Sequence, residues 1–119
     1  MIMITTIIVV MNDSNTQNVI FSRRLKELRV NKGLSQKQLG ILAGIDEFVA
    51  STRINRYEKG VHQASIRIVQ QLAAVLDVPV AYFYAEDDAL AKLVVEWNKV
   101  DLKKRERILD ILYDKSSLT

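Results

Sequence analysis

The chain has 119 residues, 49% of them hydrophobic, which is enough to bury the core of one domain and excludes an intrinsically disordered protein. It has no cysteine and a single histidine, His62, which excludes disulfides, thiolate metal sites and zinc sites built on paired histidines. The net charge is +3, but residues 21–67 hold ten Lys or Arg against four Asp or Glu, a local balance of +6.

Residues 1–11 read MIMITTIIVVM, an apolar, β-branched run that the polar stretch Asn12–Asn18 follows. The run is too short to span a membrane and lacks the basic start and cleavage site of a signal peptide. Three interpretations fit: a β-strand that pairs with a partner, an irregular arm packed on the core, or residues upstream of a natural start at Met11. We favour the strand.

From Val19 onward, apolar residues recur at the spacing of an α-helix. A first helix is expected to end at Gly33, and a second to begin after Ser35, which forms a capping box with Gln38, and to end at Gly44. Gly40 lowers helix propensity inside the second helix, so another backbone is expected to pass close to it. The inward residues of the first helix are Phe21, Leu25 and Leu28, and the cations around them are Arg23, Arg24, Lys26 and Arg29.

Three further helical segments complete the expected domain. The third runs from Asp46, which can cap its start, to Lys59, with Ile54 and Tyr57 inward. The fourth runs from the cap Ser65 to Leu76. Pro79 suits the first turn of a short fifth helix through Tyr84.

Residues 86–119 are expected to form a helical hairpin. The acidic stretch Glu86–Asp88 suits a helix N-terminus, and Asp101 can cap the last helix. This segment has an apolar face beyond what the preceding domain needs, and that face either packs back on the domain or forms a dimer. The face comprises Leu90, Val94, Trp97, Ile108 and Leu112.

Residues 33–60 read GLSQKQLGILAGIDEFVASTRINRYEKG. They resemble the phage repressor and Cro-like helix-turn-helix family, often called Xre-like. The matching elements are Gly33-Leu34-Ser35-Gln36, Leu39, Ala43-Gly44-Ile45 and Ile54-Asn55-Arg56-Tyr57-Glu58-Lys59-Gly60, followed by Leu72-Ala73, Leu76 and Val78. The resemblance covers about residues 21–85 and implies an all-α fold. Residues 19–85 would be a five-helix helix-turn-helix domain, flanked by an N-terminal arm (1–18) and the C-terminal hairpin (86–119).

The third segment has the residues that a DNA-reading helix needs. A helix in the major groove requires polar or cationic side chains on its outer face, because the base edges there carry hydrogen-bond donors and acceptors that differ between base pairs. Arg can bind guanine, and Asn adenine, in a bidentate manner. The expected base-reading residues are Ser51, Thr52, Arg53, Asn55 and Arg56.

The resemblance also implies contacts to DNA phosphates and one structural ion pair. Gln36 lies in the first turn of the second helix, where free N–H groups favour a phosphate. The expected phosphate contacts are Gln36, Lys37, Lys59 and Gln63. Arg29 and Glu58 match a family pair that bridges the first and third helices.

One departure from the family lies between Ile45 and Ile54, which eight residues separate where most members have about four. The surplus falls at Asp46–Val49, as a longer turn or as extra turns on the third helix. Phe48 and Val49 are expected to cover Ile41 and Leu42, which would otherwise be scattered apolar residues on the surface.

We therefore expect a sequence-specific transcriptional regulator that binds double-stranded DNA as a homodimer, as a repressor at a near-palindromic operator. An antitoxin, a restriction-modification controller, and a protein-interaction module that binds no DNA are the alternatives. An enzyme is not expected, because there is no glycine-rich phosphate loop and no converging acid–base set. The sequence predicts no metal, no cofactor, no small-molecule ligand and no membrane association, and the absence of cysteine fits the reducing cytoplasm.

Overall fold

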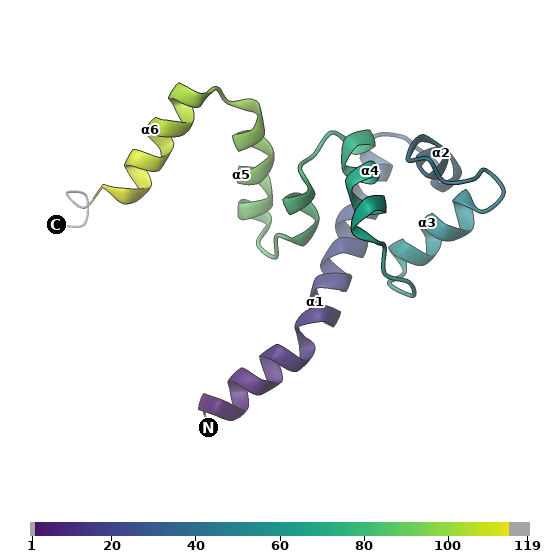
Figure 1. Ribbon diagram of the computed structural model, residues 1–119, viewed down its shortest axis with the longest axis horizontal. Coiled ribbons are helices and arrows are strands. Elements are labelled where there is room, and N and C mark those ends of the chain that lie inside the picture. Colours follow the sequence, from purple (N-terminus) through teal and green to yellow (C-terminus); the bar gives the residue numbers. More distant parts are fainter. Residues whose placement is uncertain (1, 115–119) are drawn as a thin grey trace.

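The computed structural model describes residues 2–114, and the side chains of residues 16–114. Over these residues the protein is all-helical (Figure 1), which confirms the predicted fold class. The elements in chain order are α1 (Ile2–Asn31), α2 (Gln36–Leu42), α3 (Ala50–Glu58), α4 (Ile66–Leu76), the 3₁₀ helix η1 (Val80–Tyr84), α5 (Asp88–Lys99) and α6 (Leu102–Tyr113).

Most helix ends follow the predicted caps. The Gln38 backbone N–H donates to Ser35 Oγ at 3.0 Å, and the Ser35 N–H donates to Gln38 Oε1 at 2.8 Å, so the capping box of α2 is complete. Ser65, Asp87 and Asp101 each accept a backbone hydrogen bond at the start of α4, α5 and α6. These signals lie within a few residues of the helix that they start, which is why the sequence alone reveals them.

The core lies where α1, α2, α3, α4 and η1 meet. Each contributes at least one side chain without any exposed surface; these include Leu25, Leu39, Ile54, Leu72 and Phe83. Burying one such side chain stabilises the fold by about 1.5–3 kcal/mol. Gly40 lets α2 approach α3 closely, since a Cβ there would lie 2.7 Å from Ala50 Cβ, as its place inside a helix predicted.

The strand expected over residues 1–11 is wrong for the part that the structure describes. Residues 2–11 continue α1, which runs without a break from Ile2 to Asn31 and passes the expected arm boundary at residue 18. Starting a new helix is costly, but adding residues to an existing one is nearly neutral. The helix propensity of Thr, Ile and Val is lower than that of Ala by less than about 1 kcal/mol per residue, so the packed half of α1 can carry this extension.

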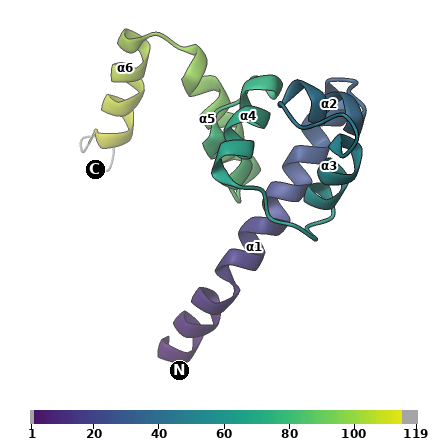
Figure 2. The same cartoon turned by 45° about the vertical axis from the view of Figure 1, so that its right-hand side comes forward.

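Two parts of the chain lead away from the core. The first half of α1 extends from one side, and α6 turns away from the body beyond α5 (Figures 1 and 2). The radius of gyration is 17.6 Å, whereas a compact domain of this length has about 14 Å. Within the described part, no helix is both long and apolar enough to span a bilayer.

Candidate nucleic-acid interface

The helix α3 has one buried face and one polar face. Ala50 and Ile54 have no exposed surface and Tyr57 is 5% exposed, so this side packs against the core. The opposite side is exposed and consists of Ser51, Thr52, Arg56 and Lys59, with Arg53 and Asn55 half-buried at its flanks. This is the division of faces that a helix needs to enter a major groove.

Of the two arrangements expected for the extra residues before α3, the structure has the longer turn. The third helix begins at Ala50, so the expected start at Asp46 is wrong, and the extra residues lengthen the turn. Asp46 Oδ1 accepts the Phe48 N–H at 2.9 Å, and its carbonyl oxygen accepts the Val49 N–H at 3.1 Å. An aspartate can close such a turn as well as cap a helix, and here the turn wins.

The turn does not form the expected apolar cover. Phe48 is 88% exposed and Leu42 is 60% exposed, and Ile41 and Val49 are also exposed. The prediction that Phe48 and Val49 fold over α2 is therefore wrong. The hydrogen bonds that Asp46 accepts hold the backbone of the turn, and in this turn the Phe48 ring lies in solvent.

Arg29 and Glu58 form the ion pair implied by the resemblance. Arg29 Nε and Nη2 donate to the two Glu58 carboxylate oxygens at 2.5 and 3.0 Å, and Nη1 donates to the Leu34 carbonyl at 2.9 Å. The side chains are only 13% and 3% exposed. The hydrogen bonds that Arg29 donates to Glu58 raise the pKa of Arg29 above its already high ordinary value, so the guanidinium stays charged at every practical pH.

Gln36 joins this network. Its side-chain amide donates to Glu58 Oε1 at 3.2 Å. Gln36, which was expected to contact a DNA phosphate, therefore binds the Glu58 carboxylate at the end of α3 in the protein without DNA. The Arg29–Glu58–Gln36 network links the start of α2, and the turn before it, to the end of α3.

Two small polar residues of α1 that the sequence did not single out also anchor the end of α3. Ser22 Oγ donates to the Tyr57 carbonyl at 2.6 Å, and Asn18 Nδ2 donates to the Gly60 carbonyl at 3.1 Å. They donate to backbone carbonyls at and just beyond the C-terminus of α3, where the donors within a helix run out. The Tyr57 carbonyl also accepts the Gly60 N–H at 3.2 Å. The one signal in the sequence was their spacing: Asn18, Ser22 and Leu25 recur at intervals of four and three on α1.

A helix-turn-helix family model matches residues 25–83, which contain α2, the turn and α3. The crystal structure of the transcriptional regulator BswR aligns with a TM-score of 0.70 at 39% sequence identity, covering 82% of this chain and 96% of that chain. The chain belongs to the Xre-like helix-turn-helix family.

Two curated relatives are described as uncharacterised HTH-type transcriptional regulators, one from Sinorhizobium medicae (strain WSM419) and one from Rhizobium meliloti (strain 1021). Each is 29% identical over 72 residues, which are 60% of this chain and 49% of the relative. The chain thus spans about half the length of these curated relatives.

The expected base-reading residues of α3 differ in how tightly the fold holds their side chains. Arg53 is held in place, because its Nη2 donates to the Tyr57 hydroxyl at 2.7 Å and its guanidinium lies 5.9 Å from the centre of that ring. Arg56, Ser51 and Thr52 are exposed, and no other described side chain binds them. Arg56 is therefore the cation of α3 that is freest to meet a base edge.

The cationic side chains of residues 21–67 do not form a single face. Arg24 is buried, and its guanidinium donates to the Ala85 carbonyl and to Asp88 Oδ1. Arg23 lies 3.5 Å from the same carboxylate oxygen, and Arg29 is held by Glu58. The exposed cations on α2, on α3 and directly after α3 are Lys37, Arg56 and Lys59, with Arg53 half-buried. Lys26, Lys32 and Arg67 are also exposed, but they lie outside these two helices.

Proposed function

We propose that this protein is a transcriptional regulator that binds double-stranded DNA through α2 and α3. The observation that carries the proposal is α3 itself. It presents a polar and cationic face, while the Arg29–Glu58 pair, Ser22 and Asn18 fix its far end to α1. A reading helix must be held in a fixed orientation to select among base edges, and the start of this one packs tightly on α2 at Gly40. BswR and the curated relatives are described as transcriptional regulators, which supports the same conclusion.

The regulator is proposed to act as a repressor whose two copies bind a near-palindromic operator and block a promoter. Within this fold, base contacts fall to Ser51, Thr52, Arg53, Asn55 and Arg56, and phosphate contacts to Gln36, Lys37, Lys59 and Gln63. A module that binds protein without DNA is less well supported, because the outer face of α3 carries Arg56, with Arg53 at its flank, and among its exposed residues no acidic one.

The affinity for duplex DNA is expected to fall steeply as salt is raised. Each neutralised phosphate adds about 0.9 to the negative slope of log affinity against log salt concentration. Replacing the exposed Lys37 by alanine should flatten that slope by about 0.9 per bound chain. The measurement is fluorescence anisotropy with labelled duplex from about 50 to 200 mM salt. Arg23→Ala is the matched control, because Arg23 pairs with Glu27 and Asp88, and its slope should not change. A salt-independent affinity would contradict the proposal.

The homodimer is proposed to form through the C-terminal helices. In the described part of the chain, α6 has no buried residue, yet Leu102, Leu109 and Leu112 recur on one face at intervals of seven and three. An apolar stripe on a projecting helix is typical of an interface with a partner. For two copies joined there to read successive half-sites, their α3 helices must lie about 34 Å apart, one turn of DNA.

Leu112→Glu is therefore expected to convert the dimer to a monomer, because it puts a charge into the stripe. Ile111, 72% exposed and outside the stripe, supplies the control Ile111→Glu, which should leave the dimer intact. Sedimentation equilibrium distinguishes the two species, and both side chains are largely exposed, so neither substitution is expected to unfold the protein. A dimer that survives Leu112→Glu would assign the interface elsewhere.

A further inference from the structure

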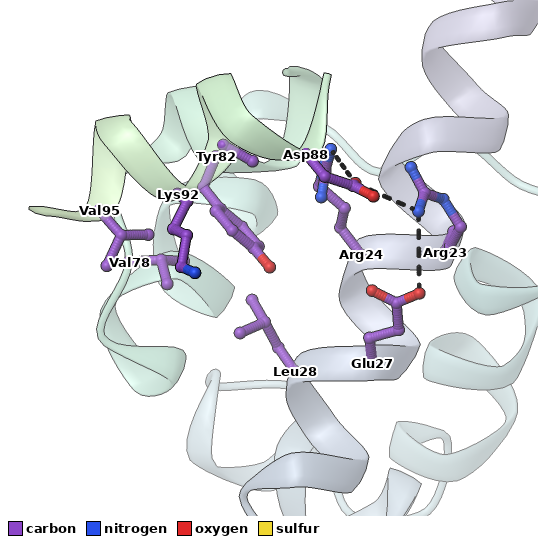
Figure 3. A pocket seen from close by; sticks show the side chains of 10 residues that line it. Arg23, Arg24, Glu27, Leu28, Val78, Tyr82, Asp88, Lys92 and Val95 are labelled. Atoms are coloured by element: carbon purple, nitrogen blue, oxygen red, sulfur yellow. Dashed lines mark hydrogen bonds and ion pairs between the residues drawn. The ribbon is translucent and has the colours of Figure 1, made fainter. Parts of the chain in front are cut away.

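A cleft of about 390 Å³ lies between the helix-turn-helix domain and α5. Its apolar wall comes from Leu28 of α1, Val78 before η1, and Val95 of α5 (Figure 3). The volume is within the range of about 300–1,000 Å³ that small-molecule sites occupy, and such sites favour junctions between parts of a fold.

The acidic groups at one end of the cleft are already paired. Asp88 Oδ1 lies 3.1 Å from Arg24 Nη2 and 3.5 Å from Arg23 Nη1, and Arg23 also reaches Glu27 at 3.9 Å (Figure 3). The Arg24 side chain is 3% exposed and is fixed, whereas Asp88 is 77% exposed and only Arg24 and Arg23 restrain its carboxylate. The two carboxylates are therefore matched by two guanidinium groups.

The other end offers donors without acceptors. The Tyr82 hydroxyl and the Lys92 side chain point toward the space over Leu28 (Figure 3). Among the described residues, neither the hydroxyl nor the ammonium group has a hydrogen-bond or ion-pair partner. The Tyr82 ring is held in place by the Arg24 guanidinium, which lies 5.2 Å from its centre. An apolar wall beside one free cation and one free hydroxyl fits a ligand with an apolar body and a single negative charge.

We propose that this cleft binds a small organic monocarboxylate, with its carboxylate on Lys92 and Tyr82 and its hydrocarbon body on Leu28, Val78 and Val95. The site is separate from the proposed DNA surface on α2 and α3, so it adds a ligand to the proposed regulator. Because α1 supplies one wall and α5 the other, the bound molecule contacts both the helix-turn-helix domain and the segment that leads to α6.

The probes are octanoate and its uncharged analogue octanamide, titrated calorimetrically into the full-length protein. Octanoate is expected to bind saturably at one site per chain and octanamide at least tenfold more weakly, because the amide lacks the charge that strengthens the hydrogen bond to Lys92. Lys92→Gln should weaken octanoate binding about tenfold or more, and Tyr82→Phe should weaken it less, since the phenyl ring still packs under Arg24. Lys103→Gln, on exposed α6, is the control and should change nothing.

Three results would overturn the proposal. No saturable binding of octanoate would remove the site. Equal affinities for octanoate and octanamide, or an octanoate affinity that Lys92→Gln does not change, would show that the cleft is only a nonspecific apolar groove. Binding that appears in Leu112→Glu but not in the parent protein would assign the cleft to a contact between two copies of this chain.

Discussion

Replacing Glu58 by alanine is expected to lower the free energy of unfolding by about 3–5 kcal/mol, the cost of removing one partner from a buried ion pair. The carboxylate is 3% exposed and accepts hydrogen bonds from Arg29 Nε and Nη2 and from the Gln36 amide. Its removal leaves Arg29 Nε and Nη2 and the Gln36 amide without that acceptor in a site that water hardly reaches, and the guanidinium keeps only the Leu34 carbonyl. Urea unfolding followed by circular dichroism measures the loss.

The chain supplies its own control for this prediction. Arg23 and Glu27 form an ion pair at 3.9 Å with side chains 44% and 51% exposed, and exposed pairs contribute about 0–1 kcal/mol. Glu27→Ala should therefore change the unfolding free energy by no more than that. If Glu58→Ala costs as little as Glu27→Ala, the buried pair does not hold α3 to α1 in the manner proposed.

A double replacement separates two quantities: the net contribution of the ion pair to the free energy of unfolding, and the loss of stability when only one partner is removed. Exchanging a buried pair for apolar residues of similar size is often neutral or even stabilising. Arg29→Met combined with Glu58→Met should consequently recover much of the stability lost in Glu58→Ala. If the double variant stays stable but binds DNA poorly, the pair serves to orient α3 more than to stabilise the fold.

The sequence predicted those features whose signals are local. The capping box of Ser35 and Gln38 spans four residues, and the glycine inside α2 marks a close approach that its missing side chain permits. The Arg29–Glu58 pair, although its partners lie 29 residues apart, came from the family resemblance and not from the pattern of charges.

The sequence did not predict two kinds of feature. One kind is a contact between residues far apart in the chain, and the other is a segment whose residues fit two local structures equally well. Arg24 belongs to a run of cations on α1, and only the fold shows that its guanidinium binds the Ala85 carbonyl 61 residues away. Asp46 carries the same signal whether it caps a helix or closes a turn. Residues 2–11 have the composition of a strand, but a helix already formed by the packed half of α1 continues through them.

Arg56→Ala is expected to weaken binding to the operator by about 1–3 kcal/mol, roughly 5- to 150-fold, with little effect on random duplex DNA. Arg56 is exposed on the outer face of α3, and no described side chain restrains it, so its guanidinium can bind a guanine edge in the major groove. A contact to a base is lost only where that base is present. The operator is first selected from a random duplex library with the parent protein, and both affinities are then measured at one salt concentration.

Lys59→Ala is the matched variant, because Lys59 is also exposed but follows the last residue of α3, where we expect it to contact a DNA phosphate. It should weaken binding to operator and random DNA by similar factors, since a phosphate contact carries no sequence information. Because α3 starts at Ala50, a second arrangement on DNA is possible. Ser51 and Thr52 occupy its first turn, the part of a reading helix that usually contacts bases. Equal losses on both DNAs for Arg56→Ala would establish that arrangement, with Arg56 on the backbone, and would defeat the assignment of Arg56 as a base-reading residue.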